Sequence, residues 1–435
     1  MEARDNDRRP SLPLDWPVVV VGAGAAGLLA AARAAMLGRP TLLLEKNRKL
    51  GVKILISGGT RCNVTHATDE RGIASAFPKY QGRFLRSPLA ALPPGRFLEW
   101  LHEQGVATKT EPGGKVFPVS DRAIDVRDAL VSFASAQGVT MQVHSAVETI
   151  EATGGGSFHL VCRDGQRFMA ARLLIACGGQ SYPGCGTSGD GYAWARSLEH
   201  TIVPPVPALT PILCAEPWLG ELAGLTIPDA SLTIVPRSDA PPESLSKQAI
   251  LQSSRGSLLF THAGLSGPVG LNVSRAISRS STPTDLMALA DFLPGLTLEE
   301  FRQQLATRLR DDGRRQVSSI LAERLPRSLA LTLLMIAQVP AERRGAELNK
   351  RELAAISRTA KHCPIHPLGT AGFLKAEVTA GGVSLEEVDS RTMQSKLVPN
   401  LFFAGEVLDI DGPIGGFNFQ AAFSTGWLAG SCMAR

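Results

Sequence analysis

The sequence predicts an α/β fold in which a Rossmann-type dinucleotide-binding domain is split by a long insertion. Three observations support this prediction. A strand, a glycine turn and a helix open the chain; a proline-rich β-like segment and a helical block fill the middle; strand and glycine-rich segments return at the end. A chain of 435 residues, 44% of them hydrophobic, is long enough for two or three such parts.

The opening unit is the segment "WPVVVVGAGAAGLLAAARAAMLGRPTLLLEK". Its β-branched run, residues 18–21, predicts a strand that stops at Gly22. The alanine-rich run 25–37 predicts a helix, and the apolar run 41–44 predicts a second strand that ends at Glu45. A strand, a helix and a strand in this order predict a parallel pair with a right-handed crossover.

The glycine turn between the first strand and the helix has a mechanical meaning. Gly22 permits a tight turn, Gly24 lets a pyrophosphate approach the backbone, and Gly27 lets helix and strand pack closely. The helix N-terminus offers N–H groups to a diphosphate, and Glu45 is placed to accept hydrogen bonds from ribose hydroxyls. These features predict a bound dinucleotide.

The rest of the chain supplies further elements. A helix is expected after Asp121, as N-cap, up to Gly138, followed by short strands near 140–150, 157–163 and 167–176. Residues 201–284 are proline-rich with short β-like runs. Capping boxes then predict two helices, one at Thr297 with Glu300 and one at Asn349 with Glu352.

The C-terminal stretch favours FAD as the dinucleotide. The strand 401–404 ends in Gly405-Glu406, and Gly412, Gly415 and Gly416 precede a helix that begins near Asn418. Glycines permit close approach to a flat ring, and a helix N-terminus stabilises negative charge on a reduced flavin. NAD and FAD share the N-terminal half-site, and no second fingerprint is present, so NAD(P)H is expected as a transient co-substrate.

Several long motifs resemble one family. They include "LLLEKNRKLGVKILISGGTRCNVTH", "GGKVFPVSDRAIDV", "LLIACGGQSYPGCGTSGDGYAWA", "LLFTHAGLSGP" and the tail from "EVTAGGV" onward. Over nearly its whole length the sequence is similar to the BaiN/RdsA-like NAD(P)/FAD-dependent oxidoreductases, some of them described as aminoacetone-oxidase-like. The resemblance implies a glutathione-reductase-like FAD-binding Rossmann domain with an inserted β-barrel and helical domain over the flavin. Thr60 stands where that family commonly has a third glycine.

The resemblance also implies which residues hold FAD. The ADP half would be held by Gly22, Ala23, Gly24, Ala25, Ala26, Gly27 and Glu45, with Lys46, Lys53 and Val147 nearby. The flavin side would be lined by Ser57, Gly58, Gly59, Arg61, Cys62, Asn63, Gly178, Gly179, Gly405, Glu406, Gly415, Gly416, Phe417 and Asn418.

The predicted domain boundaries follow these motifs. We expect a disordered lead over 1–14 and the first part of the FAD-binding domain over 15–199. The inserted β-barrel-like domain spans 200–290, with a nested helical subdomain over 291–363 and a return strand over 364–376. The FAD-binding domain resumes over 377–435.

Few residues qualify as catalytic, and all remain weak candidates. His262, in a glycine-rich turn, is either a proton donor over the flavin or a hydrogen-bonded loop residue. Arg61 is either an anion-binding residue or, as we favour, a clamp for the cofactor diphosphate. Cys62 has no CxxC partner and reads as a packed thiol rather than a redox group. Pro364 separates His362 and Cys363 from His366, so no metal site is expected.

Composition and charge indicate which partners and which cellular compartment to expect. The net charge of +5 lies on a sequence without a long Lys/Arg run, which disfavours a nucleic-acid partner. The seven cysteines include no CxxC pair, which indicates a reducing, intracellular setting. The N-terminus is polar, unlike a signal peptide, and no apolar run is long enough to span a membrane, so we predict a cytoplasmic protein.

The predicted reaction is FAD-dependent, NAD(P)H-linked reduction of an activated C=C in a small organic substrate. An FAD-dependent oxidase of an amine or alcohol, and a flavin-containing tRNA-binding protein, are the alternatives.

Overall fold

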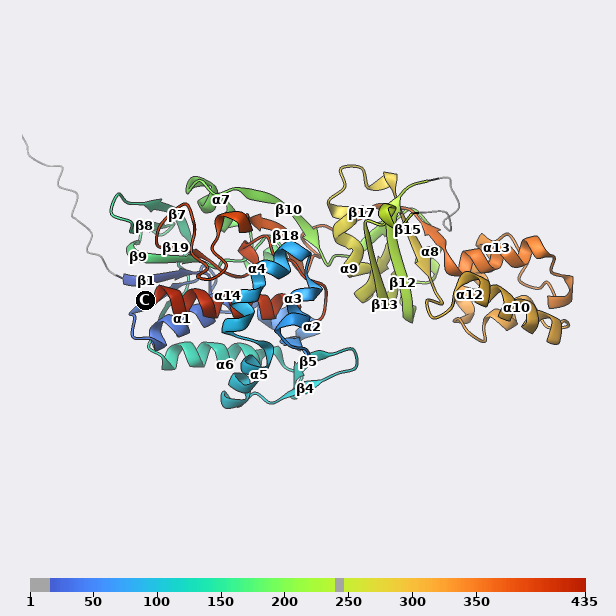
Figure 1. Ribbon diagram of the computed structural model, residues 1–435, viewed down its shortest axis with the longest axis horizontal. Coiled ribbons are helices and arrows are strands. Elements are labelled where there is room, and N and C mark those ends of the chain that lie inside the picture. The colour runs from blue at the N-terminus through green and yellow to red at the C-terminus, as the bar shows by residue number, and fades with distance from the viewer. Residues whose placement is uncertain (1–15, 239–245) are drawn as a thin grey trace, which may run out of the picture. The chain divides into compact units, whose positions relative to one another are not determined.

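A computed structural model describes residues 16–238 and 246–435 (Figure 1). The predicted disordered lead, residues 1–14, lies outside the described residues. The chain forms two compact units. Unit 1 combines residues up to Pro205 with Val378–Arg435, and unit 2 consists of Val206–Glu377. The unit formed from both ends of the chain is the one that carries the glycine turn.

Unit 1 is built on the predicted strand–helix–strand opening. Strand β1 (Trp16–Val21) leads through the glycine turn into helix α1 (Ala25–Met36), and β2 (Thr41–Leu44) returns parallel to β1. The strands of this pair are almost fully buried, because the apolar run has no polar face to offer to water. The parallel pair confirms the sequence-based prediction, although β1 begins at Trp16, two residues before the expected start.

The sheet of unit 1 has the order β6-β2-β1-β9-β8-β7, and β19 pairs with β9. Its other strands are β6 (Thr140–Gln142), β7 (Val147–Ala152), β8 (Phe158–Cys162), β9 (Arg167–Ile175) and β19 (Leu401–Phe403). The single strand expected near 140–150 is therefore two strands. His144 adopts a left-handed φ of 59°, which breaks the extended run between them.

Three helices pack along this sheet in Figure 1. Helix α14 (Phe417–Met433) lies against α1, and α6 (Ala123–Ala136) packs on the same helix. A Cβ on Gly426 would lie 2.3 Å from the Ala26 carbonyl oxygen, so the close approach of α14 to α1 requires glycine there. The predicted N-cap of α6 is wrong: the cap is Arg122, and the Asp121 carboxylate binds Lys109 and Arg61 instead.

The remaining elements of unit 1 surround these layers. They are α2 (Val52–Thr60), α3 (Glu70–Ala76), α4 (Lys79–Ala91), α5 (Pro94–Glu103), α7 (Asp190–Ser197), the small sheet of β3 (Thr65–His66), β5 (Lys115–Pro118) and β4 (Thr108–Thr110), and β18 (Val378–Val383) paired with β10 (Ile202–Ala208).

Unit 2 contains an antiparallel sheet of order β16-β15-β12-β13-β14-β11-β17. Its strands are β11 (Ile212–Cys214), β12 (Thr226–Pro236), β13 (Gln252–Thr261), β14 (Gly264–Ser266), β15 (Leu286–Asp291), β16 (Cys363–Ile365) and β17 (Pro367–Thr370). The two edge strands β16 and β17 are joined by His366 alone, so the sheet must curl until its edges meet. This closure gives the barrel that the family resemblance implied, with α8 (Trp218–Glu221) and α9 (Gly267–Ser278) packed on it.

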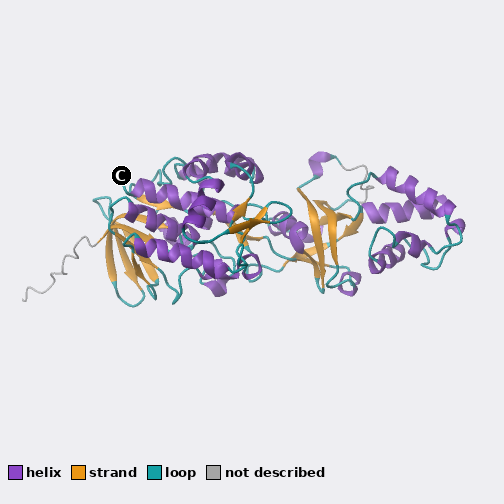
Figure 2. Cartoon of the chain, turned by 90° about the horizontal axis from the view of Figure 1, so that it is seen from below, coloured by secondary structure: helices purple, strands orange, loops and turns teal. Residues whose placement is uncertain are grey.

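A helical module, defined here as residues 298–361, is inserted between β15 and β16 (Figure 2). It contains α10 (Leu298–Asp311), α11 (Val317–Leu321), α12 (Arg327–Ile336) and α13 (Lys350–Lys361). Both predicted capping boxes are present, at Thr297 with Glu300 and at Asn349 with Glu352. No helix among the described residues is long and apolar enough to span a bilayer.

Candidate functional site

The glycine turn after β1 contains two kinds of glycine. A Cβ on Gly22 would lie 2.6 Å from the Cys177 Cα, and one on Gly27 would lie 1.9 Å from the Gly22 carbonyl oxygen. Gly24 differs, because a Cβ there would meet no atom within 4 Å. No side chain caps the N-terminus of α1, which begins beside Gly24. The open space and uncapped N–H groups fit a diphosphate, as the sequence predicted.

Glu45 is held rigidly at the end of β2. Its carboxylate accepts hydrogen bonds from the backbone N–H groups of Ala23 at 2.9 Å and Asn47 at 2.8 Å, and the residue is buried. A carboxylate with two fixed donors keeps lone pairs for further hydroxyl groups. The neighbouring Val147, at the start of β7, is also buried, and the Ser145 N–H donates to the Glu45 carbonyl. This arrangement fits the predicted ribose and adenine contacts.

Helix α2 is interrupted at the stretch expected to follow the flavin. Ser57 is extended, and Gly58, Gly59 and Thr60 all take left-handed φ values, 54°, 66° and 69°. Left-handed backbone favours glycine, so the threonine at position 60 is strained where the resembled family commonly has glycine. A Cβ on Gly59 would meet no atom within 4 Å. The kink therefore exposes backbone rather than side chains.

Two neighbours of this kink behave differently. Asn63 is buried, and its Oδ1 has no hydrogen-bond partner among the described residues. A buried amide oxygen without a partner fits a ligand donor such as an N–H group. Cys62 is fully buried, and burial raises the pKa of its thiol to about 12. The thiol stays protonated near neutral pH, in agreement with its interpretation as a packing residue.

Arg61 is engaged by the protein itself. Its guanidinium pairs with Glu111, donates through Nε to the Asp121 carboxylate at 2.8 Å, and lies 4.1 Å from the centre of the Phe117 ring. Hydrogen bonds from Lys109 and from Arg61 lower the pKa of Asp121. A diphosphate clamp at Arg61 would require these contacts to break, and it stays a prediction.

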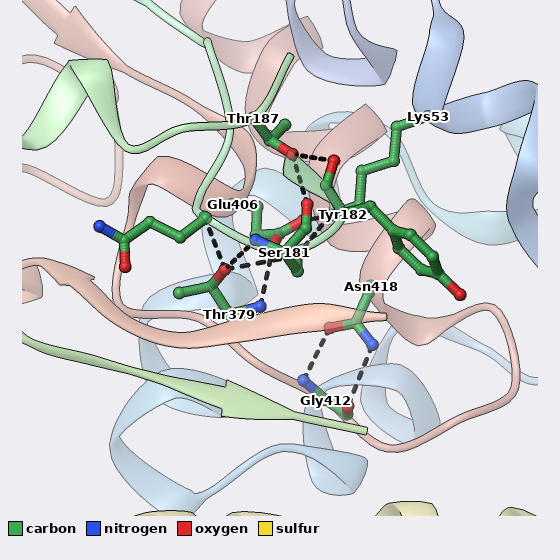
Figure 3. Close-up of polar contacts among 9 residues, drawn as sticks. Lys53, Ser181, Tyr182, Thr187, Thr379, Glu406, Gly412 and Asn418 are labelled. Atoms are coloured by element: carbon green, nitrogen blue, oxygen red, sulfur yellow. Dashed lines mark hydrogen bonds and ion pairs between the residues drawn. The ribbon is translucent and has the colours of Figure 1, made fainter. Parts of the chain in front are cut away.

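A polar cluster joins four segments of unit 1 in Figure 3. Lys53 Nζ lies 2.6 Å from Glu406 Oε2 and 2.7 Å from Ser181 Oγ. Glu406 Oε1 accepts from Ser181 Oγ at 2.7 Å and from the Thr379 N–H at 2.9 Å. A Cβ on Gly179 would lie 2.4 Å from Thr379 Oγ1, so this strand end needs glycine. We call these four residues, Lys53, Ser181, Thr379 and Glu406, the Lys53 cluster.

The sequence analysis expected Lys53 and Glu406 to hold FAD, which stays a prediction, and it did not expect them to bind each other. Ser181 and Thr379 were not expected at the site. The hydroxyl residues carry no spacing signal, since they meet only when β18 approaches the segment that follows β9. Gly178, with a φ of 78°, turns the chain just before this segment.

Lys46, by contrast, contacts none of these groups. It pairs with Asp190, and Nζ lies 2.6 Å from Ser188 Oγ. Asp190 is the first residue of α7, and Gly189 occupies the N-cap position.

The tail glycines form a loop against β3. Gly415 and Gly416 have φ values of 131° and 89°, and a Cβ on Gly416 would lie 2.4 Å from the Thr65 carbonyl oxygen. Asn418, at the start of α14, brackets Gly412: its Oδ1 accepts from the Gly412 N–H at 2.8 Å and its Nδ2 donates to the Gly412 carbonyl at 3.0 Å (Figure 3). Asn418 therefore fixes the shape of this loop.

His66 is a further residue of the loop that sequence reasoning missed. Its Nδ1 lies 3.1 Å from the Gly415 carbonyl oxygen, and its ring stacks on Phe417 with centroids 4.5 Å apart. Because a carbonyl can only accept, Nδ1 carries the proton in this contact. The only sequence signal was its place at the end of the "GGTRCNVTH" segment.

The two catalytic candidates lie in different units, Arg61 in unit 1 and His262 in unit 2. His262 is exposed in the turn between β13 and β14 in unit 2. Within the described residues, no group of three or more His, Cys, Asp or Glu side chains is arranged to hold a metal ion. All seven cysteines are free thiols.

Comparisons with known proteins agree with this geometry. A family model described as the HI0933-like protein Rossmann domain matches residues 16–432. A ribosomal RNA dihydrouridine synthase of Escherichia coli K12 is 33% identical over 415 residues, covering 95% of this chain and 96% of the relative. A 3-dehydro-bile acid delta(4,6)-reductase of Clostridium scindens is 31% identical over 419 residues, covering 96% and 98%.

The fold is also similar to that of a solved 3-ketosteroid-delta4-(5alpha)-dehydrogenase from Rhodococcus jostii RHA1. The TM-score is 0.50 at 16% identity, and the alignment covers 100% of both chains.

Proposed function

Because this chain belongs to the HI0933-like Rossmann family of FAD-dependent oxidoreductases, we propose that it reduces a C=C bond conjugated to a carbonyl group, with NAD(P)H as electron donor. In the balanced reaction one carbon of the double bond receives a hydride and the other a proton from water. NAD(P)H leaves as NAD(P)⁺. The nicotinamide binds transiently, since the chain has one dinucleotide fingerprint.

The observation that carries this proposal is a bond type common to two relatives. Dihydrouridine is uridine whose C5–C6 double bond, conjugated to a ring carbonyl, has been saturated. A 3-dehydro substrate with double bonds at positions 4 and 6 likewise has its C=C bonds conjugated to a ketone. The two substrates share little else, so the conjugated bond is the property that this chain is expected to have in common with both.

The residues of unit 1 have separate roles in this proposal. FAD, when bound, supplies hydride chemistry that no amino-acid side chain can provide. The backbone at Gly24 and the α1 N-terminus would bind the diphosphate, and Glu45 would orient the adenosine ribose. Asn63 Oδ1 is the acceptor offered to a ring N–H group. The Lys53 cluster holds the strand ends around the site.

The N-terminus of α14 is the electrostatic element of the site. No side chain among the described residues caps this helix, and a turn that ends at Gly416 precedes it. The positive end of a helix would favour negative charge on a flavin ring bound beside it. His66 and Asn418 orient that turn by holding Gly415 and Gly412.

The substrate has two candidate sources with the same chemistry, the uracil ring of ribosomal RNA and a small cyclic enone. The relatives at 33% and 31% identity point to one source each. The earlier expectation of a small organic substrate therefore gains a specific competitor, although the sequence had disfavoured nucleic acid. Neither relative is named for tRNA, so the tRNA-binding alternative has no observation in its favour.

An anaerobic titration tests the proposal. The purified protein is mixed with NADPH and, separately, with NADH, and the flavin absorbance is followed. We expect one donor to bleach the flavin, and either a cyclic enone or a uridine-containing rRNA fragment to restore the absorbance. Bleaching by an amine or alcohol, with re-oxidation by oxygen alone, would instead support the oxidase alternative, and no bleaching by either nucleotide would refute NAD(P)H linkage.

A further inference from the structure

We propose that the helical module is a docking surface for the phosphate backbone of RNA, an inference that rests on the RNA branch of the proposed function. The module holds 13 Lys and Arg residues against 8 Asp and Glu residues, a net charge of +5. The other residues carry 32 of each kind, so the whole excess of the chain lies in this segment. The basic excess is concentrated, although no run of cations in the sequence reveals it.

The fold gathers many of these cations at one end of the module. Lys361, the last residue of α13, donates to the Leu293 carbonyl at 2.6 Å, close to the start of α10. The two helices are therefore antiparallel, and the end of α10 lies beside the start of α13, as Figure 1 shows. Backbone hydrogen bonds join the intervening loops, from Ala346 N–H to Gly313 O and from Gly345 N–H to Arg315 O. We call this end of the module the basic tip.

Five exposed cations lie at the basic tip, and none of them has an ion-pair partner among the described residues: Arg310, Arg314, Arg344, Lys350 and Arg351. Three acids without an ion-pair partner among the described residues, Asp311, Glu342 and Glu347, share this region. Other arginines are neutralised locally: Arg308 and Arg315 both pair with Glu323. The unpaired cations are therefore in excess over the unpaired acids.

The residue types indicate how RNA would be bound. Four of the five cations are arginines, whose planar guanidinium groups match phosphate oxygens in pairs. The single aromatic residue of the module, Phe301, is buried, so no ring is available to stack on bases. Phosphate contacts without base contacts position RNA but do not read its sequence. Binding by the basic tip should be salt-dependent and largely sequence-independent.

The buried core makes the tip a fixed surface. Phe301, Leu305 and Leu309 of α10 belong to one buried apolar cluster with Leu329 of α12 and Ile356 of α13. Charge reversal at exposed positions leaves this core intact, since surface substitutions away from packed groups change stability little. The proposal can therefore be tested without unfolding the protein.

The test compares two triple variants of the full-length protein. One carries Arg314→Glu, Arg344→Glu and Lys350→Glu at the basic tip. The matched control carries Arg163→Glu, Arg167→Glu and Arg196→Glu, three exposed arginines of unit 1. The binding of a fluorescein-labelled, uridine-containing RNA hairpin is measured by anisotropy at several salt concentrations. Reduction of a cyclic enone by NAD(P)H is measured in parallel.

We expect the tip variant to bind RNA at least about tenfold more weakly and to lose about three units of the salt slope. The control variant has the same change in net charge and should keep most of its RNA affinity and most of its salt slope. Equal loss in the two variants, or no RNA binding by the wild type, would overturn the proposal. Reduction of the hairpin uridines, followed by mass spectrometry beside the enone assay, distinguishes the two hypotheses: a wild type that reduces neither substrate but still binds RNA would refute the reductase and leave the docking surface standing.

Discussion

The two units of this chain use polar groups in opposite ways. Unit 1 holds Glu45, the Lys53 cluster and Asn418 in short networks in which nearly every donor has a fixed acceptor. The helical module of unit 2 leaves five cations exposed and unpaired at its tip. Fixed networks suit a ligand of one shape, whereas exposed cations suit a polymer of repeating charge. On our proposals, the networks of unit 1 would bind the cofactor and the tip of the module would dock the substrate.

The largest expected effect comes from the two kinds of glycine in unit 1. Gly27→Val places a side chain against the Gly22 carbonyl and should lower the free energy of unfolding by about 3 kcal/mol. Gly24→Val points into open space, so we expect the apoprotein to keep its stability within about 1 kcal/mol while FAD affinity falls at least about tenfold. Denaturant unfolding measures the stability of each variant, and FAD titration measures its affinity for the cofactor. If Gly24→Val bound FAD normally, the diphosphate would lie elsewhere.

The Lys53 cluster tests whether the fixed network is needed for the fold. Glu406→Leu leaves Lys53 without its carboxylate at a site where both side chains are about one-quarter exposed, so we expect a loss of about 2 kcal/mol. Adding Lys53→Met should restore part of the loss. A double-mutant cycle by urea unfolding gives the coupling, and additive losses would argue against a shared network.

His66 should have a smaller effect on the tail loop. His66→Phe keeps the stack on Phe417 but removes the Nδ1–H donor to Gly415, which should cost about 1 kcal/mol of unfolding free energy. His66→Asn retains a donor and should recover part of it. His102→Phe, at an exposed histidine that contacts Thr108, is the control. FAD retention should weaken in His66→Phe and stay unchanged in the control.

The smallest expected effect concerns alkaline pH. Burial raises the pKa of the Cys62 and Cys177 thiols to about 12 from an ordinary value of 9.0. Above pH 9 the unfolded chain loses protons that the folded chain keeps, so stability is full below that pH and falls as the pH rises toward 12. Urea unfolding should give a lower free energy of unfolding at pH 10 than at pH 8. Cys62→Ala should reduce the slope of this free energy against pH. An unchanged slope would mean that other groups cause the loss.

The local parts of the fold were predictable from the sequence. The βαβ opening, its glycines and both capping boxes follow from signals within a few residues of one another, and the structure has them at the expected positions. The kink of α2 at Ser57 and the break at His144 were not predictable, because backbone geometry there is decided by tertiary contacts rather than by residue preference.

Contacts within the candidate site could be predicted only where the two residues in contact belong to one short segment. The Lys53 cluster and the contact of His66 with Gly415 each join residues about 350 positions apart, and nothing in the spacing of those residues indicates the meeting. Their sequence signal would be a hydroxyl or imidazole directly after a glycine-rich strand end, a pattern that many loops share. The basic tip was missed for a related reason, since its cations come from the ends of different helices.

The most direct measurement of the central claim is an anaerobic single turnover. The protein, reduced with one equivalent of NAD(P)H and freed of excess donor, is mixed with a cyclic enone or with a uridine-containing rRNA fragment, and the product is identified by mass spectrometry. The account predicts re-oxidation of the flavin together with a product that has gained two hydrogens across its conjugated double bond. Flavin that stays reduced with both substrates until oxygen is admitted would contradict it.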